Sequence, residues 1–290
     1  MTAPFSVIIP AHNEEDVIGR CLKALYDGAP ADALPEVIVA ANGCKDRTVA
    51  IARELAPDAT VLDLPPGSKV IAMNEANRLA TVAPRFFLDA DVQCSYASLA
   101  ATADALREPG IMTASPALRM DLSRCDHWVR SYYRVWLTQP YITDRLVGSG
   151  LFGLSAEGLE IMGEIPPTFA DDTWVRTRFS YEQRRNVSQD AQGNPVWFTV
   201  SPPRTRADLV KIEARRRIGS EQVLNLYPSP HNGKINRPAD LGEALKGGAT
   251  IADVGVYLGL KAVALARYRW NKARGKTPVW VRDVNARKTG

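Results

Sequence analysis

Short apolar runs alternate with segments of helical spacing over the first hundred residues. The runs are rich in β-branched and aromatic side chains, as in strands buried on both faces of a sheet; they cover residues 5–10, 36–41, 60–64 and 85–91. The segments between them place apolar residues on one helical face and cover residues 14–26, 46–56 and 68–81. Strands that alternate with helices of roughly ten to fifteen residues indicate βαβ units. The pattern therefore predicts an α/β fold with a mostly parallel central sheet and flanking helices.

The first of these helices has a clear start signal. Asn13 is expected to cap it, so that Glu14, Glu15 and Asp16 fall in the first turn. The helix dipole favours acidic side chains there. We therefore expect this helix to begin at Glu14.

Polar loops follow three of the predicted strands at their carboxyl ends, after Pro10, after Ala41 and at Asp89. Open α/β sheets bind their ligands at this edge. No GxGxxG pattern follows the first strand, and GxxxxGK[ST] does not occur, so the glycine cradles of dinucleotide and P-loop sites are missing.

Asp89 and Asp91 stand one residue apart at the end of the fourth apolar run. Two carboxylates at a strand end suit a hard divalent cation, which takes oxygen ligands and also binds phosphate oxygens. Aspartates are equally typical of turns that follow strands. The pair alone therefore leaves both interpretations open.

Composition places the chain among globular proteins. Its 290 residues are 46% apolar and 23% charged, which suits a substantial core and excludes disordered and fibrous classes. The four cysteines are scattered and form no CxxC pair, so we do not expect a zinc site or a disulfide framework. The same pattern favours a cytoplasmic location. The start of the sequence does not resemble a signal peptide, and the most apolar long window, residues 251–270, is interrupted by Asp253 and Lys261.

Charge is distributed unevenly along the chain. Residues 1–200 hold 18 basic and 25 acidic side chains, whereas residues 201–290 hold 18 basic and 7 acidic ones. A basic C-terminal part could meet nucleic acid, an anionic membrane surface or an anionic substrate, or it could simply be a solvated surface.

Five segments in this order resemble family 2 glycosyltransferases, which are inverting enzymes with the GT-A fold. They read SVIIPAHNEEDVIGRCLKAL, VIVAANGCKDRT, GSKVIAMNEANRLA, RFFLDADV and GSGLFGLSAEGLEIMGEIPPTFADDTWVRTRF. The resemblance spans residues 5–178 and implies a Rossmann-like sheet. It also implies a glycosyltransferase domain over residues 1–225, with a nucleotide-sugar-binding half (1–115) and an acceptor-binding half (116–225). Residues 226–290 would form a loop and an amphipathic, basic extension.

The resemblance assigns donor-binding roles to residues at the carboxyl edge of the sheet. These are Pro10, Ala11, His12, Glu14, Asn42, Lys69, Asp89, Ala90 and Asp91. Asn42 stands where many relatives have an acidic residue that reads the base, so the base is left open. His12 could equally be a loop histidine without a function, Glu14 could serve the helix N-terminus, and Lys69 could be an exposed first-turn lysine.

The catalytic roles also come from the resemblance. Asp91 would bind Mg²⁺ or Mn²⁺ on the donor diphosphate, and Asp172 would be the general base, with Asp171 beside it. The alternative for the acidic pair is that it favours a helix N-terminus. Arg215 and Arg216 lie where relatives bind the departing diphosphate, although a basic helix face explains them as well.

The implied reaction moves a sugar from a UDP-, GDP- or dTDP-sugar to a hydroxyl of a saccharide, polysaccharide or lipid-linked acceptor, without nucleic acid. A retaining GT-A transferase or a nucleotidylyltransferase is the alternative enzyme, although the second should have a glycine-rich loop after the first strand. A non-catalytic nucleotide-sugar-binding or membrane-anchoring module is a further alternative. The amphipathic segment around Val254, Tyr257, Leu258, Leu260 and Val263 would either bind an anionic membrane surface at the inner face of the plasma membrane or pack on the core.

Overall fold

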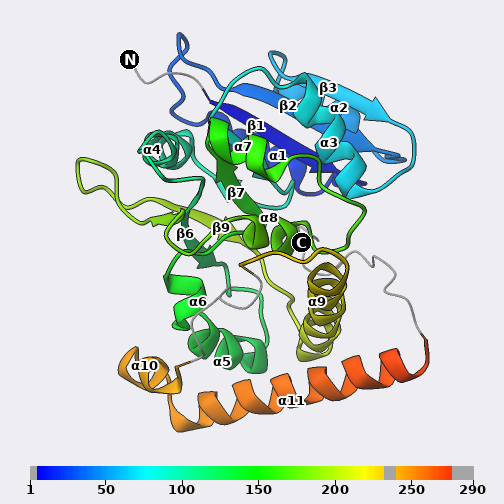
Figure 1. Cartoon of the computed structure of the whole chain (residues 1–290), viewed down its shortest axis with the longest axis vertical. Coiled ribbons are helices and arrows are strands. Elements are labelled where there is room, and N and C mark those ends of the chain that lie inside the picture. Colours follow the sequence, from blue (N-terminus) through cyan, green and yellow to red (C-terminus); the bar gives the residue numbers. More distant parts are fainter. Residues whose placement is uncertain (1–4, 232–239, 276–290) are drawn as a thin grey trace.

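The computed structural model describes residues 5–231 and 240–275. One mixed sheet runs through the molecule, and helices cover both of its faces (Figure 1). Its strands are β1 (Ser6–Ala11), β2 (Glu36–Asn42), β3 (Thr60–Leu64), β4 (Arg85–Leu88), β5 (Gln93–Cys94), β6 (Thr113–Met120), β7 (Leu151–Leu154), β8 (Arg184–Val187) and β9 (Trp197–Val200).

The helices in the first half of the chain are α1 (Ile18–Tyr26), α2 (Thr48–Leu55), α3 (Lys69–Leu79), α4 (Tyr96–Leu106) and α5 (His127–Trp136). The later helices are α6 (Pro140–Thr143), α7 (Ala156–Met162), α8 (Asp171–Arg178), α9 (Arg206–Leu226), α10 (Leu241–Lys246) and α11 (Ile251–Ala273).

The strand order is β3-β2-β1-β4-β7-β6-β9-β5, and β8 pairs with β6. The first four strands are parallel, as the sequence predicts, whereas β7 is antiparallel to both β4 and β6. Because β7 runs opposite to β4, its amino end lies beside the carboxyl end of β4, with Leu151 opposite Leu88. Residues just before β7 are thereby brought to the edge where Asp89 leaves β4.

Side chains of the central strands alternate between two apolar cores, one on each face of the sheet. On β1, Val7 and Ile9 enter one core and Ile8 enters the other. On β4, Phe86 and Phe87 divide in the same way. This two-sided burial explains why these strands read as continuous apolar runs.

The predicted start of the first helix is wrong. α1 begins at Ile18 and not at Glu14, and Val17 is its N-cap residue. Asn13 has a left-handed backbone with a φ of 54° and its side-chain oxygen accepts a hydrogen bond from the Lys45 backbone N–H, so it does not cap the helix. The three acidic residues after it form the turn that leads into α1 and lie outside the helix.

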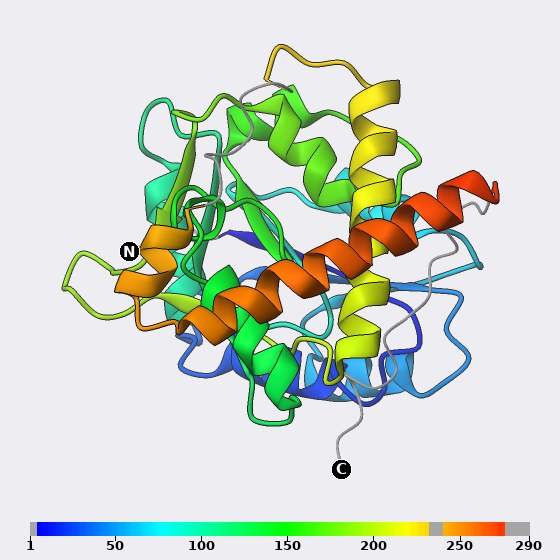
Figure 2. The same cartoon turned by 90° about the horizontal axis from the view of Figure 1, so that it is seen from below.

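The C-terminal helices form a layer at the far end of the molecule from β1–β3 (Figure 1). Viewed from below, α11 runs diagonally across this end (Figure 2). Buried Glu213 on α9 pairs with Lys261 on α11 at 2.6 Å and so joins these two helices. Glu213 also pairs with Arg216 on its own helix at 3.3 Å. Within the described ranges, no helix combines the length and apolar character needed to cross a membrane.

Candidate active site

The loops after β1 and β2 are joined to each other by hydrogen bonds. Pro10 and Ala11 are the last residues of β1 and Asn42 is the last of β2, and all three are buried. His12 Nδ1 bonds to the Asn42 carbonyl oxygen, and the amide of Asn13 lies 3.2 Å from His12 Nε2. The second contact makes Nε2 an acceptor, so Nδ1 carries the proton and donates. His12 is therefore fixed against the end of β2.

Glu14 lies deeper than a loop residue normally would, with 4% of its surface exposed. Its backbone N–H donates to Thr48 Oγ1 at 2.7 Å, and its carbonyl accepts from Val17 and Ile18. The backbone of Glu14 thus ties the start of α1 to the start of α2.

Asp89, Ala90 and Asp91 form the turn directly after β4. The Asp89 backbone N–H donates to the Gly150 carbonyl at 2.8 Å, and the Asp89 carbonyl accepts from Val92 at 3.0 Å. Ala90 is buried at 3% exposure, whereas Asp91 is half-buried. The two carboxylates therefore stand on a turn that Gly150, the residue just before β7, holds in place.

Lys69 lies between two carboxylates that are distant in sequence. It is the first residue of α3, after the Ser68 cap, as the sequence predicts. Its Nζ lies 2.7 Å from Asp89 Oδ1 and 2.9 Å from Asp171 Oδ2. Burial alone would lower the pKa of the Lys69 ammonium, but Asp171 and Asp89 outweigh burial and raise it. Lys69 is therefore a charged bridge and not an exposed lysine.

The same contacts perturb Asp89. Burial raises the pKa of the Asp89 carboxyl to about 6, because Asp91 and Asp171 add to the effect of burial while Lys69 opposes it. The Asp89 carboxyl therefore changes its charge near pH 6.

Asp171 and Asp172 are the first two residues of α8, which follows Ala170 as its N-cap residue. Asp172 Oδ1 accepts from the Thr173 backbone N–H at 2.7 Å, and the Thr173 hydroxyl lies 3.1 Å from that of Ser220 on α9. The first contact orients Oδ1 of Asp172, and the second joins the start of α8 to α9.

A short glycine loop contacts both acidic segments. Gly148, Ser149 and Gly150 have φ angles of 105°, 61° and 99°, a left-handed run that glycine tolerates best. A Cβ at Gly148 would lie 2.6 Å from Asp172 Cβ and 2.9 Å from Asp172 Oδ2, and a Cβ at Gly150 would lie 2.6 Å from Val92 Cγ2. Glycine at both positions therefore allows the loop to fit between the Asp-x-Asp turn and the start of α8.

α9 passes beside the start of α8, where Gly219 would place a Cβ 3.1 Å from Ala170 Cβ. Burial alone would lower the pKa of Arg216, but Glu213, Tyr133 and Asp172 outweigh it and raise the pKa. Arg216 is therefore near enough to Asp172 for their charges to interact. Arg215 is half-buried and, at about 100° per residue, leaves the helix in another direction.

Reasoning from the sequence missed three features of this site: the Gly148–Gly150 loop, the bridge from Lys69 to Asp171, and Arg176. Arg176 lies one turn after Asp172 on α8; burial lowers its pKa, and the charge of Asp172 opposes that shift. The four-residue spacing of Asp172 and Arg176 was readable in the sequence. Nothing local in the sequence pairs Lys69 with Asp171, because 102 positions separate them.

The site fits a metal ion only in one way. In residues 5–231 and 240–275, no group of three or more histidine, cysteine or acidic side chains could hold a metal by itself. Asp89 is paired with Lys69, and Asp91 is the second carboxylate of the same turn and is half-buried. Mg²⁺ and its analogues commonly bind through one or two carboxylates together with substrate phosphates. The residues present therefore fit a metal shared with a phosphorylated substrate.

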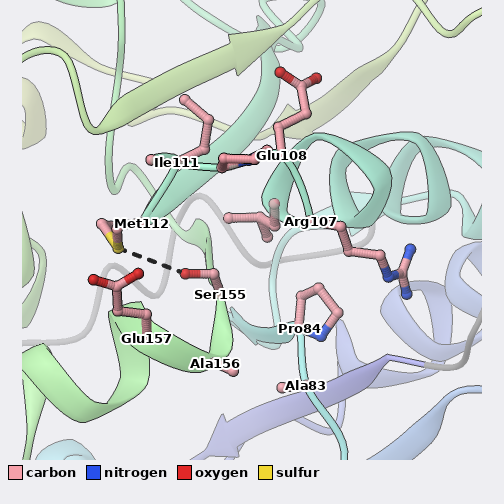
Figure 3. Close-up of a pocket in the computed structure, with 12 residues that line it drawn as sticks. Ala83, Pro84, Arg107, Glu108, Ile111, Met112, Ser155, Ala156 and Glu157 are labelled. Carbon is pink, nitrogen blue, oxygen red and sulfur yellow. Dashed lines mark hydrogen bonds between the residues drawn. The ribbon is translucent and has the colours of Figure 1, made fainter.

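A separate pocket of about 330 Å³ lies at the opposite end of β4. Figure 3 shows its lining by Pro84, Arg107, Glu108 and Ser155, the last of which contacts the sulfur of Met112 at 3.9 Å. Because Pro84 precedes β4 and Asp89 follows it, this pocket is distinct from the acidic site.

Comparison with known proteins gives the family of the chain. A search of curated proteins finds no match. A mannosyltransferase from Pyrobaculum calidifontis, in complex with GDP-Man and Mn²⁺, is 21% identical; the alignment covers 96% of this chain and 77% of that one, with a TM-score of 0.59. A glucosyl-3-phosphoglycerate synthase from Mycobacterium tuberculosis, in complex with Mn²⁺, UDP-glucose and phosphoglyceric acid, is 18% identical over 78% of this chain and 81% of that one, with a TM-score of 0.54. These likenesses confirm the fold. The model of glycosyl transferase family 2 matches residues 6–153, and the chain therefore belongs to this family and is a glycosyltransferase of the GT-A fold.

Proposed function

We propose that the protein transfers a sugar from a nucleotide-sugar donor to an acceptor hydroxyl, in one displacement that inverts the anomeric carbon. The main support is the position of two acidic segments around one loop. Gly150 contacts the Asp-x-Asp turn, and Gly148 contacts Asp172. Groups for holding a donor and a group for activating an acceptor thus lie on two sides of the same short segment.

The donor would lie at the carboxyl ends of β1, β2 and β4. Pro10, Ala11 and His12 would lie against the nucleoside, and Asn42 would read the base, since an amide both donates and accepts. Similar structures are complexes with GDP-Man and with UDP-glucose, so UDP-, GDP- and dTDP-sugars are all candidate donors. Asp89 and Lys69 would face the ribose and sugar side of the donor.

Asp91 would hold Mg²⁺ or Mn²⁺ together with the donor diphosphate. Such an ion would neutralise the negative charge that grows on the departing nucleoside diphosphate. Arg216 would add a positive charge for the departing diphosphate, and its ion pair with Glu213 on the same helix restricts its position. Arg215 would complete the basic surface of that helix.

Asp172 would act as the general base. The acceptor oxygen attacks the anomeric carbon, its proton passes to Asp172, and the bond between the anomeric carbon and the diphosphate oxygen breaks with its electron pair on the diphosphate. Thr173 holds Oδ1, and the missing side chain at Gly148 leaves space beside Oδ2. Asp171 would keep Lys69 in place and would not take the proton itself.

The acceptor would be a saccharide, a polysaccharide or a lipid-linked glycan, and no role for nucleic acid is proposed. The reaction would take place in the cytoplasm. The extension predicted over residues 226–290 would serve the location of the enzyme and not its chemistry; residues 232–239 and 276–290 of this extension lie outside the described residues.

The first experiment incubates the purified protein with UDP-, GDP- and dTDP-sugars and Mn²⁺, and follows donor hydrolysis by mass spectrometry. The proposal expects slow release of one nucleoside diphosphate, which Asp91→Ala abolishes and Asp104→Ala leaves unchanged. Asp104 is a suitable control because its side chain is 63% exposed on α4 and pairs with Arg107, three residues away on the same helix. If the protein neither hydrolysed any donor nor bound any donor in a metal-dependent way, the proposal would be refuted.

A further inference from the structure

The last long helix, α11, has one face that packs on the protein. Tyr257 and Ala264 are buried, and the Tyr257 ring lies 5.1 Å from that of Tyr132 on α5. Lys261 also points inward, where it pairs with Glu213. The predicted amphipathic segment therefore packs on the core, but only along this face.

The opposite face of α11 exposes large apolar side chains. Ile251, Leu258, Val263 and Trp270 are 83%, 50%, 54% and 59% exposed. At about 100° per residue they fall within a sector of roughly 140°, and the other exposed positions of this sector are glycine, alanine and Arg269. Figure 1 shows that the helices in contact with α11 all lie on its inner side. An apolar stripe of this length on a surface helix is unusual unless something covers it.

The charges on the exposed face of α11 indicate which kind of partner could cover the apolar stripe. Arg267, Arg269 and Arg274 are exposed near the end of α11, and the Arg274 guanidinium lies 4.1 Å from the centre of the Trp270 ring. Asp253, the single acid of α11, is buried at 3% exposure and caps the helix start. The exposed face of α11 thus carries positive charge and no negative charge.

A second copy of the chain would bring two faces of this same positive charge together. An anionic lipid surface instead offers negative headgroups for the arginines and an apolar layer for the side chains. Tryptophan and arginine side by side are typical of the membrane–water boundary, where both an apolar body and a polar tip find a suitable environment. The length and charge pattern suit a helix that lies in the plane of the interface.

We propose that the outer face of α11 binds the surface of an anionic lipid bilayer, with Ile251, Leu258, Val263 and Trp270 at the level of the acyl boundary. Arg267, Arg269 and Arg274 then contact the phosphate headgroups. The inner face stays packed on α5 and α9, so the helix lies flat without leaving the protein. This proposal depends on α11 alone and not on the roles proposed for the acidic residues.

The test is sedimentation of the full chain with vesicles of phosphatidylcholine alone and with vesicles that also contain phosphatidylglycerol. We expect binding to the second kind only, and weaker binding as salt is raised. Leu258→Glu with Val263→Glu, and separately Arg267→Glu with Arg269→Glu, should each weaken binding about tenfold or more. Equal sedimentation of wild type and both variants would overturn the proposal.

Matched controls come from the opposite end of the molecule. Leu79→Glu on α3 changes a leucine with 52% exposure, against 50% for Leu258, and Arg53→Glu changes an exposed arginine on α2. Both controls should bind vesicles like the wild type. Circular dichroism checks that the α11 variants remain folded, and intrinsic fluorescence of wild type against Trp270→Phe gives a second readout: only the wild type should shift to the blue on lipid. A lipid-free dimer that Leu258→Glu dissociates, seen by light scattering, would assign the face to a second copy and overturn the proposal.

Discussion

Lys69 Nζ lies 2.7 Å from Asp89 Oδ1 and 2.9 Å from Asp171 Oδ2, so one ammonium joins the Asp-x-Asp turn to the start of α8. The three side chains are 30%, 34% and 13% exposed, which shields the pairs in part from solvent. Without this cation the two carboxylates would repel each other across the site. In the proposed mechanism, Lys69 therefore joins the side of the site that would hold the donor to the side that would activate the acceptor.

Lys69→Met should lower kcat/KM for donor turnover on the order of a hundredfold, because partly buried carboxylates lose their counter-charge and separate. Lys69→Arg should retain part of the activity, since it keeps the charge but not the compact shape. Lys23→Met, at an exposed lysine on α1, is the control and should behave like the wild type. Wild-type kinetics in Lys69→Met would show that the bridge has no functional role.

Gly148→Ala should reduce activity more than it reduces stability. The new Cβ would come within 2.6 Å of Asp172 Cβ, so either the loop or the start of α8 must move. Gly110→Ala is a close control, because Gly110 also has a positive φ, of 82°, but has open space around it. Both variants should lose roughly 1 kcal/mol of unfolding free energy from backbone strain, whereas only Gly148→Ala should lose turnover. Equal turnover in the two variants would argue against a close fit of this loop to Asp172.

The activity should depend on pH through Asp89. Burial raises the pKa of this carboxyl to about 6, so a growing fraction becomes protonated as the pH falls below that value and loses its pairing with Lys69. We expect kcat/KM to fall on the acidic side with a midpoint near pH 6 in the free enzyme. Because Lys69 lowers the Asp89 pKa, the residual activity of Lys69→Met should show this midpoint at a higher pH. A profile that is flat through this range in the wild type would contradict the assignment.

Asp253 should stabilise the C-terminal layer in a pH-dependent way. Hydrogen bonds from Thr250 and Ser131 and the charge of Arg134 lower the pKa of Asp253 from 3.8 to about 2. A folded-state pKa below the unfolded value means that the stabilisation is present above pH 3.8 and is lost as the pH falls toward about 2.

Asp253→Asn should therefore cost about 1 kcal/mol of unfolding free energy near neutral pH, since it weakens the capping box of α11, and the cost should shrink in acid. Asp104→Asn on α4 is the control and should change little. Chemical denaturation of wild type and variant, near neutral pH and in acid, measures the difference in unfolding free energy. A cost that is the same in acid and at neutral pH would show that the charge of Asp253 is not responsible.

The strands β1, β2 and β4 of the parallel half could be predicted because they are buried on both faces, whereas β3 is a partly exposed edge strand. Val7, Ile8 and Ile9 enter two cores in alternation, so their run is continuously apolar and easily recognised. The start of α1 could not be placed, since the left-handed backbone of Asn13 depends on its contact with the loop after β2.

The positions of the acidic residues in the fold could be predicted from the sequence, but their contacts could not. Asp91, Asp171 and Asp172 stand at the strand end and helix start that the motifs indicate. The contacts of Gly148 and Gly150 depend on β7 running antiparallel to β4, and that pairing joins segments more than sixty positions apart. No local pattern carries such information. The outer face of α11 could be read from the sequence only as amphipathic, because its buried side is fixed by Tyr132 and Glu213 from other helices.

The most direct test of the proposed mechanism is the configuration of the first sugar that is released. An α-linked nucleotide sugar is incubated with the enzyme and Mn²⁺, and proton NMR follows the anomeric signals before mutarotation equilibrates them. A single displacement, with Asp172 activating water in place of the acceptor, predicts that the β-anomer appears first and that Asp172→Asn abolishes its formation while donor binding is retained. Initial release of the α-anomer would contradict inversion and the role of Asp172 as its base.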